Sequence, residues 1–233
     1  MIYDVLIPAY NEAGSIHRIE TELIPELKKN SIDFEILIVN DGSSDSTGEI
    51  SDEIASRRRD VRVIHHSVNQ GLGAALRTGY KNAKHPWVIS IDCDLSYSPD
   101  QIMNLLEKVQ SDVDVIIGSP YMKNGDVVGV SQVRIIPSKS ISILYSIIVG
   151  KWLTCWTGMF RVMKTSAIRS IEITQDGFDG VAEIAVKLAR KRFKIVEVPA
   201  VLGLRTEGES KASFMREFTK HLKQLIKVLL RRI

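Results

Sequence analysis

The chain has 233 residues, 44% of them apolar and 25% charged, a composition that excludes both a wholly disordered chain and a disulfide-stapled mini-protein. Its formal net charge is only +3, but the charge is unevenly distributed. Residues 1–118 carry 11 Lys and Arg against 19 Asp and Glu, a net of −8, whereas residues 119–233 carry 20 against 9, a net of +11. The basic half favours an anionic partner: nucleic acid, a membrane surface or a phosphorylated substrate.

Cysteine content and hydrophobic run lengths indicate where the protein works. Only Cys93 and Cys155 are present, so a disulfide framework is not expected and a reducing, intracellular compartment is favoured. The amino terminus lacks the basic region and cleavage site of a signal peptide. The longest uncharged run in an apolar region, 140–150, has 11 residues, against the roughly 20 needed to span a bilayer. We therefore expect no transmembrane helix.

Strand and helix signals alternate through the first half of the chain. The signals predict strands at 2–7, 34–39, 61–64, 87–91 and 113–117, and helices at 15–29, 46–58, 71–83 and 99–110. Pro25 predicts a kink or break in the first of these helices. Because the strands are continuous Ile, Val and Leu runs, they indicate an α/β fold with a mostly parallel sheet covered by helices on both faces.

The second half is less regular. Its pattern predicts helices at 131–153, 179–192 and 214–233, and strands at 155–162 and 194–198. The terminal helix is amphipathic, with Leu222, Ile226 and Leu229 in an apolar arc and Lys223 and Lys227 in a basic one. Two readings stay open: the helix packs on its own domain, or it lies on anionic lipid. The apolar residues of 140–153 could serve the same surface.

Asp92 and Asp94 directly follow a predicted strand, where two carboxylates could hold a divalent cation against a diphosphate. The spacing alone is weak evidence, because Asp112 and Asp114 share it. The second pair flanks the start of a strand, where charges are usually solvated. Position in the fold therefore favours the first pair as a metal site, with a solvated loop as the alternative.

Further polar motifs also follow strand ends, where open parallel sheets bind ligands. Asp41 could contact a nucleoside or simply form a turn, whereas Asp45 or Ser46 is expected to cap the next helix. Tyr10 and Glu12 could flank a nucleobase or belong to an ordinary loop. The segment 71–73, Gly-Leu-Gly, matches neither a P-loop nor a dinucleotide fingerprint, so it predicts close backbone packing.

Two charged pairs in the second half have alternative interpretations. Arg205 and Lys211 lie in a short loop and could clamp a phosphate or remain solvated. Asp179 and Glu183 are four residues apart on a predicted helix. They are candidate bases if the acceptor is a hydroxyl, and salt-bridged surface residues otherwise.

An ordered series of segments gives the most specific signal. The segments are IPAYNEAGSI, IVNDGSSDST, NQGLGAALRTGY, SIDCDLSYSPD, TGMFRVMK, DGVAEIAVKLARKRFKIVEVP and LRTEGESK. Together they resemble glycosyltransferase family 2, and within it the dolichyl-phosphate mannose synthase-like polyprenyl-phosphate glycosyltransferases. The resemblance implies a GT-A catalytic domain over 1–211, with a nucleotide-sugar half (1–118) and an acceptor half (119–211), followed by an amphipathic helix (212–233).

The resemblance also implies inverting transfer of a sugar, with mannose from GDP-mannose favoured, to polyprenyl or dolichyl phosphate at the cytoplasmic face of a membrane. The implied nucleotide-sugar residues are Pro8, Tyr10, Glu12, Val39, Asp41, Asp92, Cys93 and Asp94. Mg²⁺ or Mn²⁺ would be held by Asp92, Asp94 and Ser96. The implied acceptor-phosphate residues are Arg134, Ser138, Arg205 and Lys211, and the implied catalytic residues are Asp94, Arg134, Arg205 and Lys211.

Three positions depart from the family pattern. Cys93 replaces the usual Ala, and its backbone is expected to make the contact. Ser96 stands where relatives often carry Gln, and Pro120 stands where these synthases typically carry Arg. One alternative is the same fold using UDP-glucose or UDP-N-acetylglucosamine and a hydroxyl acceptor. Another is a non-catalytic lipid-docking protein that binds nucleotides. The basic residues are not interleaved with aromatic ones, so nucleic acid is not an expected partner.

Overall fold

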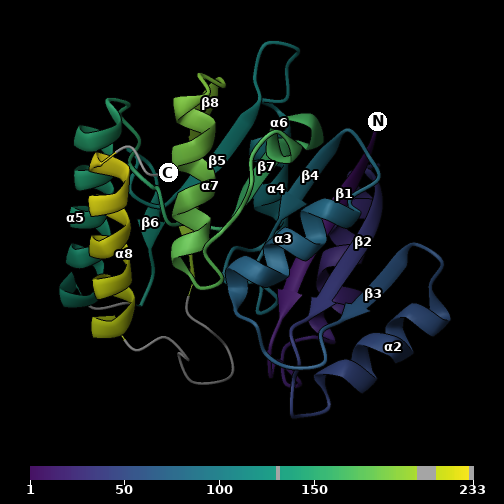
Figure 1. Cartoon of the computed structure of the whole chain (residues 1–233). Helices are drawn as coiled ribbons and strands as arrows, with labels where there is room; N and C mark the ends of the chain where they lie inside the picture. The colour runs from purple at the N-terminus through teal and green to yellow at the C-terminus, as the bar shows by residue number, and fades with distance from the viewer. Residues whose placement is uncertain (130–131, 204–213, 231–233) are drawn as a thin grey trace.

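A seven-stranded sheet forms the centre of the molecule (Figure 1). The computed structural model describes residues 1–129, 132–203 and 214–230, with only the backbone for 132–134 and 214–218. The strand order is β3-β2-β1-β4-β7-β5-β8, and all strands are parallel except β7, which is antiparallel to both neighbours. The bounds are β1 (Ile2–Ala9), β2 (Asp33–Asn40), β3 (Val61–His65), β4 (Trp87–Ser90), β5 (Val115–Ser119), β7 (Arg161–Lys164) and β8 (Ile195–Pro199). The predicted mostly parallel α/β fold is confirmed.

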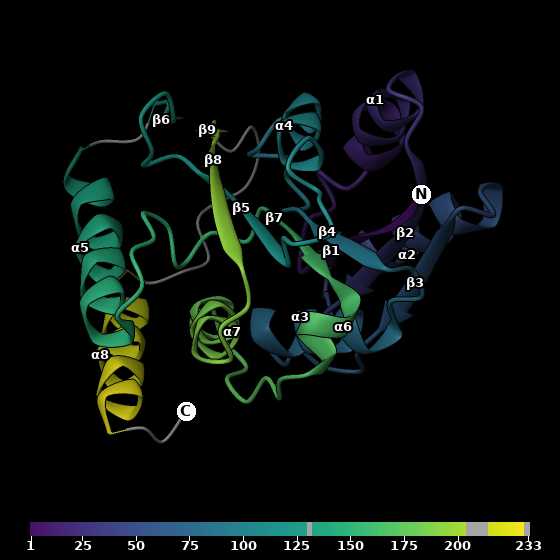
Figure 2. The ribbon, with the colours of Figure 1, turned by 90° about the horizontal axis from the view of Figure 1, so that it is seen from above.

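Both faces of the sheet are buried because successive strand residues point to opposite sides. Val5 and Ile7 pack with one set of helices and Leu6 with the other. Helices α1 and α4 lie on one face, with α3, α6 and α7 on the other (Figure 2). The bounds are α1 (Ile24–Lys29), α2 (Thr47–Arg57), α3 (Leu72–Asn82), α4 (Ile102–Leu106), α6 (Thr165–Arg169) and α7 (Asp179–Arg190).

Two helices begin with a non-α turn. The π-helical turn η1 (Ile19–Leu23) precedes α1, so the chain changes helix type beside Pro25, as the sequence predicts. The 3₁₀ turn η2 (Pro99–Gln101) precedes α4, which ends at Leu106 rather than at residue 110. The predicted long helices are therefore shorter composite elements.

The strand predicted at 155–162 is largely wrong, because β7 occupies Arg161–Lys164 instead. Side chains hold the preceding backbone away from the sheet. The Glu197 carboxylate accepts hydrogen bonds from the amides of Thr154 and Cys155. The buried Arg161 guanidinium donates to the carbonyl of Trp156 at 2.7 Å. Two short strands, β6 (Asp126–Val127) and β9 (Val201–Leu202), were not predicted and pair with each other.

Helices α5 (Gln132–Val149) and α8 (Phe214–Leu229) lie side by side at one end of the molecule, next to α7 (Figures 1 and 2). A buried polar contact joins them: the Tyr145 hydroxyl donates to Gln224 Oε1 at 2.6 Å and lies 3.2 Å from His221 Nδ1. Among the described residues, no helix is both long enough and apolar enough to cross a membrane.

Candidate active site

The loops that follow β1 and β2 are joined by hydrogen bonds across the ends of the two strands. The Asn11 amide donates to Ser43 Oγ at 3.0 Å, and the Glu12 amide donates to Thr47 Oγ1 at 2.7 Å. In return, the Ser44 amide donates to Asn11 Oδ1 at 2.8 Å. Asn11 adopts a left-handed conformation, with φ of 51°, which Asn tolerates better than most residues. The two loops therefore form one unit that carries Glu12 and its neighbour Tyr10.

Asp41 is buried just after β2, and its carboxylate holds the segment that leads into α3. Oδ1 accepts hydrogen bonds from His66 Nδ1 at 2.6 Å and from the Gln70 amide at 3.0 Å. Oδ2 accepts from Asn69 Nδ2 at 2.8 Å and from the Gly71 amide at 2.7 Å. Four donors on one carboxylate occupy about all of its lone-pair positions. The carboxylate thus fixes the shape of the 66–71 segment.

Asp92 and Asp94 lie in a tight turn at the carboxyl end of β4. The Leu95 amide closes the turn onto the Asp92 carbonyl at 3.0 Å, with Leu95 at a left-handed φ of 48°. Asp94 is only 3% exposed, and its Oδ1 accepts hydrogen bonds from both the amide and the hydroxyl of Ser96. The Asp94 carboxylate beside the Ser96 hydroxyl, with Asp92 two residues earlier in the turn, offers hard oxygen donors, which fit Mg²⁺ or Mn²⁺.

Three other predicted pocket residues are buried. Pro8 and Val39 face each other in the β1–β2 register near the carboxyl ends of these strands. Cys93 lies between the two aspartates with its side chain in the core. At such positions a ligand can contact backbone atoms more readily than side chains, as expected for Cys93.

Sequence reasoning missed one contact to the Asp92–Leu95 turn. Arg18, which precedes η1, donates from Nη1 to the Asp94 carbonyl at 2.6 Å. The two residues are 76 positions apart, so no local spacing could have revealed the contact.

The Gly-Leu-Gly segment at the start of α3 packs against the loop before α7, which confirms the prediction. The Gly73 amide donates to the Asp176 carbonyl at 2.7 Å. A Cβ at Gly73 would lie 2.1 Å from the Gln175 carbonyl oxygen, so only glycine fits. These residues bring α3 and α7 together.

The interpretation of Glu183 as a surface residue is wrong. Glu183 is fully buried and pairs with Lys187 Nζ at 2.7 Å. It also accepts hydrogen bonds from the Thr174 amide and hydroxyl and from the Gln175 amide. Burial alone would raise the pKa of Glu183, but its bonds to Lys187, Thr174 and Gln175 lower that pKa below its ordinary value. Glu183 is therefore poorly suited to remove a proton from a hydroxyl.

The predicted acceptor residues are only partly described. Ser138 lies on α5, with its hydroxyl 3.4 Å from Thr157 Oγ1. The neighbouring Lys139 places its ammonium 5.4 Å from the ring centre of Tyr121. The Arg134 side chain, Arg205 and Lys211 lie outside the described part of the structure.

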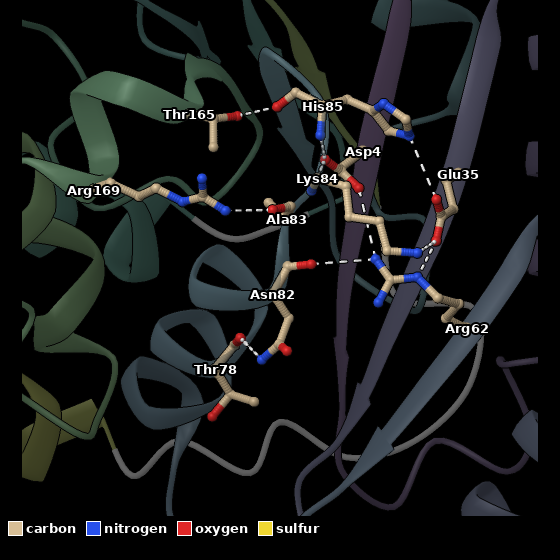
Figure 3. Close-up of polar contacts among 10 residues, drawn as sticks. All are labelled: Asp4, Glu35, Arg62, Thr78, Asn82, Ala83, Lys84, His85, Thr165 and Arg169. Atoms are coloured by element: carbon tan, nitrogen blue, oxygen red, sulfur yellow. Dashed lines mark hydrogen bonds and ion pairs between the residues drawn. The ribbon is translucent and has the colours of Figure 1, made fainter.

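A second charged cluster lies at the opposite edge of the sheet, near the amino-terminal ends of β1 and β2 (Figure 3). Asp4, Glu35 and His85 come close enough to suggest a metal site. However, Lys84 Nζ lies 3.0 Å from Glu35, and Arg62 contacts both carboxylates. The two cations already balance the two carboxylates, and a divalent ion here would be repelled. We therefore interpret the cluster as a structural salt-bridge network.

A mostly parallel sheet with an Asp-x-Asp turn at its carboxyl edge, beside two interlocked loops, has the architecture of a GT-A glycosyltransferase. Comparison with known sequences specifies the family. The chain belongs to glycosyl transferase family 2, whose sequence profile matches residues 4–172.

Two curated relatives match most of the chain. The Pyrococcus furiosus dolichol-phosphate mannosyltransferase is 31% identical over 232 residues, covering 97% of this chain and 64% of that protein. The Micrococcus luteus undecaprenyl-phosphate mannosyltransferase is 30% identical over 214 residues, covering 89% of this chain and 86% of that protein. The chain thus spans a little under two thirds of the length of the Pyrococcus relative.

Solved structures confirm the fold. The glucosyl-3-phosphoglycerate synthase of Mycobacterium tuberculosis, bound to phosphoglyceric acid, superposes with a TM-score of 0.72. It is 19% identical in sequence, and the match covers 99% of this chain and 79% of that one. The same enzyme has been crystallised with Mn²⁺ and UDP and with Mg²⁺ and UDP, with TM-scores of 0.70 and 0.71.

Proposed function

We propose that the protein transfers one sugar, mannose from GDP-mannose, to a polyprenyl phosphate. The observation that carries the proposal is the buried Asp92–Leu95 turn at the edge of the sheet where the interlocked loops also end. Both curated relatives are named as mannosyltransferases acting on a polyprenyl-type phosphate, which supports mannose as the sugar and a polyprenyl phosphate as the acceptor. Under this proposal residues 1–118 bind the nucleotide sugar and residues 119–211 bind the acceptor.

The chemistry needs little acid–base help from the protein. The nucleophile is an acceptor phosphate oxygen, which is already ionised at pH 7. It forms a bond to the anomeric carbon as the bond from that carbon to the donor diphosphate breaks, and the diphosphate leaves with the electron pair. In-line attack inverts the anomeric centre. The task of the enzyme is therefore to hold two anions close together in the right geometry.

Named residues can divide this task. In our proposal Tyr10 and Glu12 bind the nucleoside, and Asp41 holds the 66–71 segment beside it. Asp92, Asp94 and Ser96 would hold Mg²⁺ or Mn²⁺, which when bound would neutralise negative charge on the leaving diphosphate. Residues 119–233, which contain the acceptor half and have a net charge of +11, would attract the acceptor phosphate, with Arg134, Arg205 and Lys211 binding it.

A hydroxyl acceptor is the less favoured alternative. It requires a base, and Glu183 is buried under four donors, with a lowered pKa. A phosphate acceptor requires no such group. Glu183 therefore does not support a hydroxyl acceptor.

The test combines donors, metals and acceptor. The full chain is incubated with GDP-mannose, UDP-glucose or UDP-N-acetylglucosamine, with Mg²⁺ or Mn²⁺, and with or without a polyprenyl phosphate. We expect GDP release from GDP-mannose only when lipid phosphate is present.

Asp94→Asn should reduce the rate by about 10²-fold or more, and Asp112→Asn, from the other pair with the same spacing, should not. Turnover only with a UDP-sugar would overturn the choice of donor. No turnover with any combination would overturn the transferase proposal.

We further propose that the acceptor half docks on the cytoplasmic face of an anionic membrane through α5 and α8. At about 100° per residue, the described part of α8 has three sectors. His221, Gln224, Leu225 and Val228 are buried, whereas Leu222, Ile226, Leu229 and Leu230 are exposed. The third sector is basic and contains Lys220, Lys223 and Lys227. Helix α8 therefore packs on the protein without covering most of its own apolar face.

Helix α5 also exposes apolar side chains. Ile136, Ile143, Leu144 and Ile147 are exposed along it, and Trp152 just beyond its end is 70% exposed. Trp prefers the interface between bilayer and water, because its ring is apolar but carries an N–H donor. Lys139 and Lys151 flank this stretch. Apolar side chains between cations are the chemistry that binds an anionic bilayer surface.

A further inference from the structure

The Asp92–Leu95 turn has to hold a strained shape. Leu95 is a branched residue with φ of 48°, a conformation that persists only where surrounding contacts enforce it. Burial of the Leu95 side chain is one such contact. A second such contact is the hydrogen bond from Arg18 Nη1 to the Asp94 carbonyl at 2.6 Å, which fixes the peptide group between Asp94 and Leu95.

The direction of the Arg18 side chain is itself fixed. Its Nε and Nη2 donate to the two Glu22 carboxylate oxygens at 2.7 and 2.8 Å, a bidentate geometry that orients a guanidinium well. Ile19 and Leu23 of η1 are buried and anchor this turn of helix in the core. Nη1 donates to the Asp94 carbonyl, and the Arg18 side chain is 19% exposed.

We propose that Arg18 is a positioning residue for the reaction. Oriented by its hydrogen bonds to Glu22, Arg18 holds the Asp92–Leu95 turn in the shape that binds the metal–diphosphate. The inference rests on the proposed function. In this role Arg18 acts on the backbone of the turn, through its hydrogen bond to the Asp94 carbonyl, and not on the substrate.

Glu22 has a second consequence for the site. A cation this close to Asp94 would weaken the attraction of the carboxylates for a metal ion. The Glu22 carboxylate offsets that charge, and its hydrogen bond with Arg18 lowers the pKa of Glu22, so that it stays ionised at neutral pH. Arg18 can then act through its hydrogen bond without opposing the metal by its charge.

The test measures Mn²⁺ binding by electron paramagnetic resonance in the presence of GDP or UDP, without acceptor, so that no turnover is needed. Arg18→Ala should raise the apparent Kd for Mn²⁺ at least about tenfold, while nucleotide affinity in EDTA changes less than about twofold. Arg18→Lys should be intermediate, because one ammonium cannot reproduce the planar fork. Glu22→Gln should raise the Mn²⁺ Kd a few-fold. The matched control is Arg57→Ala, which removes an arginine bound to Glu20 of the same turn η1 and should leave Mn²⁺ binding unchanged.

The outcomes separate the two proposals. If wild-type protein binds Mn²⁺ with a nucleotide and Arg18→Ala matches Arg57→Ala, the role of Arg18 is refuted and the proposed function stands. If wild-type protein binds Mn²⁺ with neither nucleotide, the proposed function fails and this inference fails with it. Should Arg18→Ala not fold, Arg18→Lys and Glu22→Gln decide the question, and wild-type Mn²⁺ affinity in both would refute the inference.

Discussion

Asp41 shows how a single side chain can shape a site through its own chain. Its carboxylate binds His66, Asn69 and the amides of Gln70 and Gly71, and so fixes the segment between β3 and α3. Any nucleoside bound here would meet a loop that Asp41 has already organised. The predicted nucleoside role of this residue and its observed structural role are therefore compatible.

We expect Asp41→Asn to destabilise the protein by about 2–3 kcal/mol. Asn offers one acceptor oxygen where Asp offers two, so its amide would face two donors of the 66–71 segment. Urea denaturation measures the loss. Asp52→Asn is the matched control, because Asp52 is exposed and bonds only the half-exposed His65, and it should change stability by less than about 0.5 kcal/mol. Equal stability of the two variants would contradict the structural role.

Residue-level prediction from sequence succeeded where local order carries the information. Asp45 or Ser46 was expected to cap the next helix, and Asp45 Oδ1 accepts from the Thr47 amide at 3.0 Å at the start of α2. Arg18 and His66 were not found, because their partners are 76 and 25 positions away in sequence. Such contacts depend on how helices and strands are arranged in space, which residue spacing does not encode.

The junction of α3 with the loop before α7 depends on glycine at the element scale. We expect Gly73→Ala to destabilise the protein by about 1–3 kcal/mol, because its Cβ would lie 2.1 Å from the backbone oxygen of Gln175. Backbone cannot rotate away as a side chain could, so the elements must separate. Thermal or urea unfolding measures the change. Lys81→Ala, on the exposed side of the same helix, should remain within about 0.5 kcal/mol of wild type.

The exposed sector of α8 makes membrane docking testable. We expect the full chain to sediment with vesicles of phosphatidylcholine and phosphatidylglycerol, and to bind less as salt rises and screens the lysines. Replacing Ile226 and Leu229, which are 58% and 65% exposed, with Glu should reduce binding at least about tenfold. The loss reflects removal of apolar burial worth about 1.5–3 kcal/mol per side chain, together with two added negative charges.

The matched control for this experiment is Ile2→Glu with Val68→Glu. Both side chains are exposed and apolar, and both lie outside α5 and α8. This double variant carries the same change in charge and composition, so it should bind vesicles nearly as well as wild type. Equal loss in both double variants would show that net charge, not the α8 face, governs binding.

Prediction of elements succeeded for the β-α-β part and weakened after residue 118. The early strands are apolar runs bounded by turn residues, and these local signals identify them. Strand β7 has only four residues and lies antiparallel between β4 and β5. Its position follows from side-chain anchors such as Glu197 and Arg161 that bind the preceding loop. The sequence pattern contains no signal for those long-range bonds.

At the scale of the whole molecule, the two edges of the sheet serve different purposes. The carboxyl edge carries Asp41, Asp92 and Asp94, the predicted site. The amino-terminal edge carries the balanced cluster of Asp4, Glu35, Arg62 and Lys84 (Figure 3). A metal–nucleotide site requires an excess of negative charge, whereas a structural site requires charge balance. The acidic character of the first half thus has both a functional and a structural part.

Buried and paired carboxylates predict how the molecule responds to acid. The pKa of Glu183 is lowered in the fold, so the folded state binds its proton more weakly than the unfolded state, whose pKa is about 4.3. Its contribution to stability is therefore present above about pH 5 and is lost as pH falls through the folded pKa. Glu35 acts in the same direction, because Lys84 and Arg62 lower its pKa despite burial, which alone would raise it.

We expect the free energy of unfolding to fall steeply between pH 5 and pH 3, roughly the range of these carboxyl groups. Glu183→Gln should be less stable than wild type by about 2–3 kcal/mol at pH 7, because Gln pairs poorly with Lys187 and faces amide donors with one oxygen only. The variant should also show a shallower decline with acid, so that the two curves converge near pH 3. Urea denaturation at pH 7, 5, 4 and 3 measures both curves. Parallel curves would mean that Glu183 has the same pKa in the folded and the unfolded chain. In that case the buried ion pair between Glu183 and Lys187 does not hold the loop before α7.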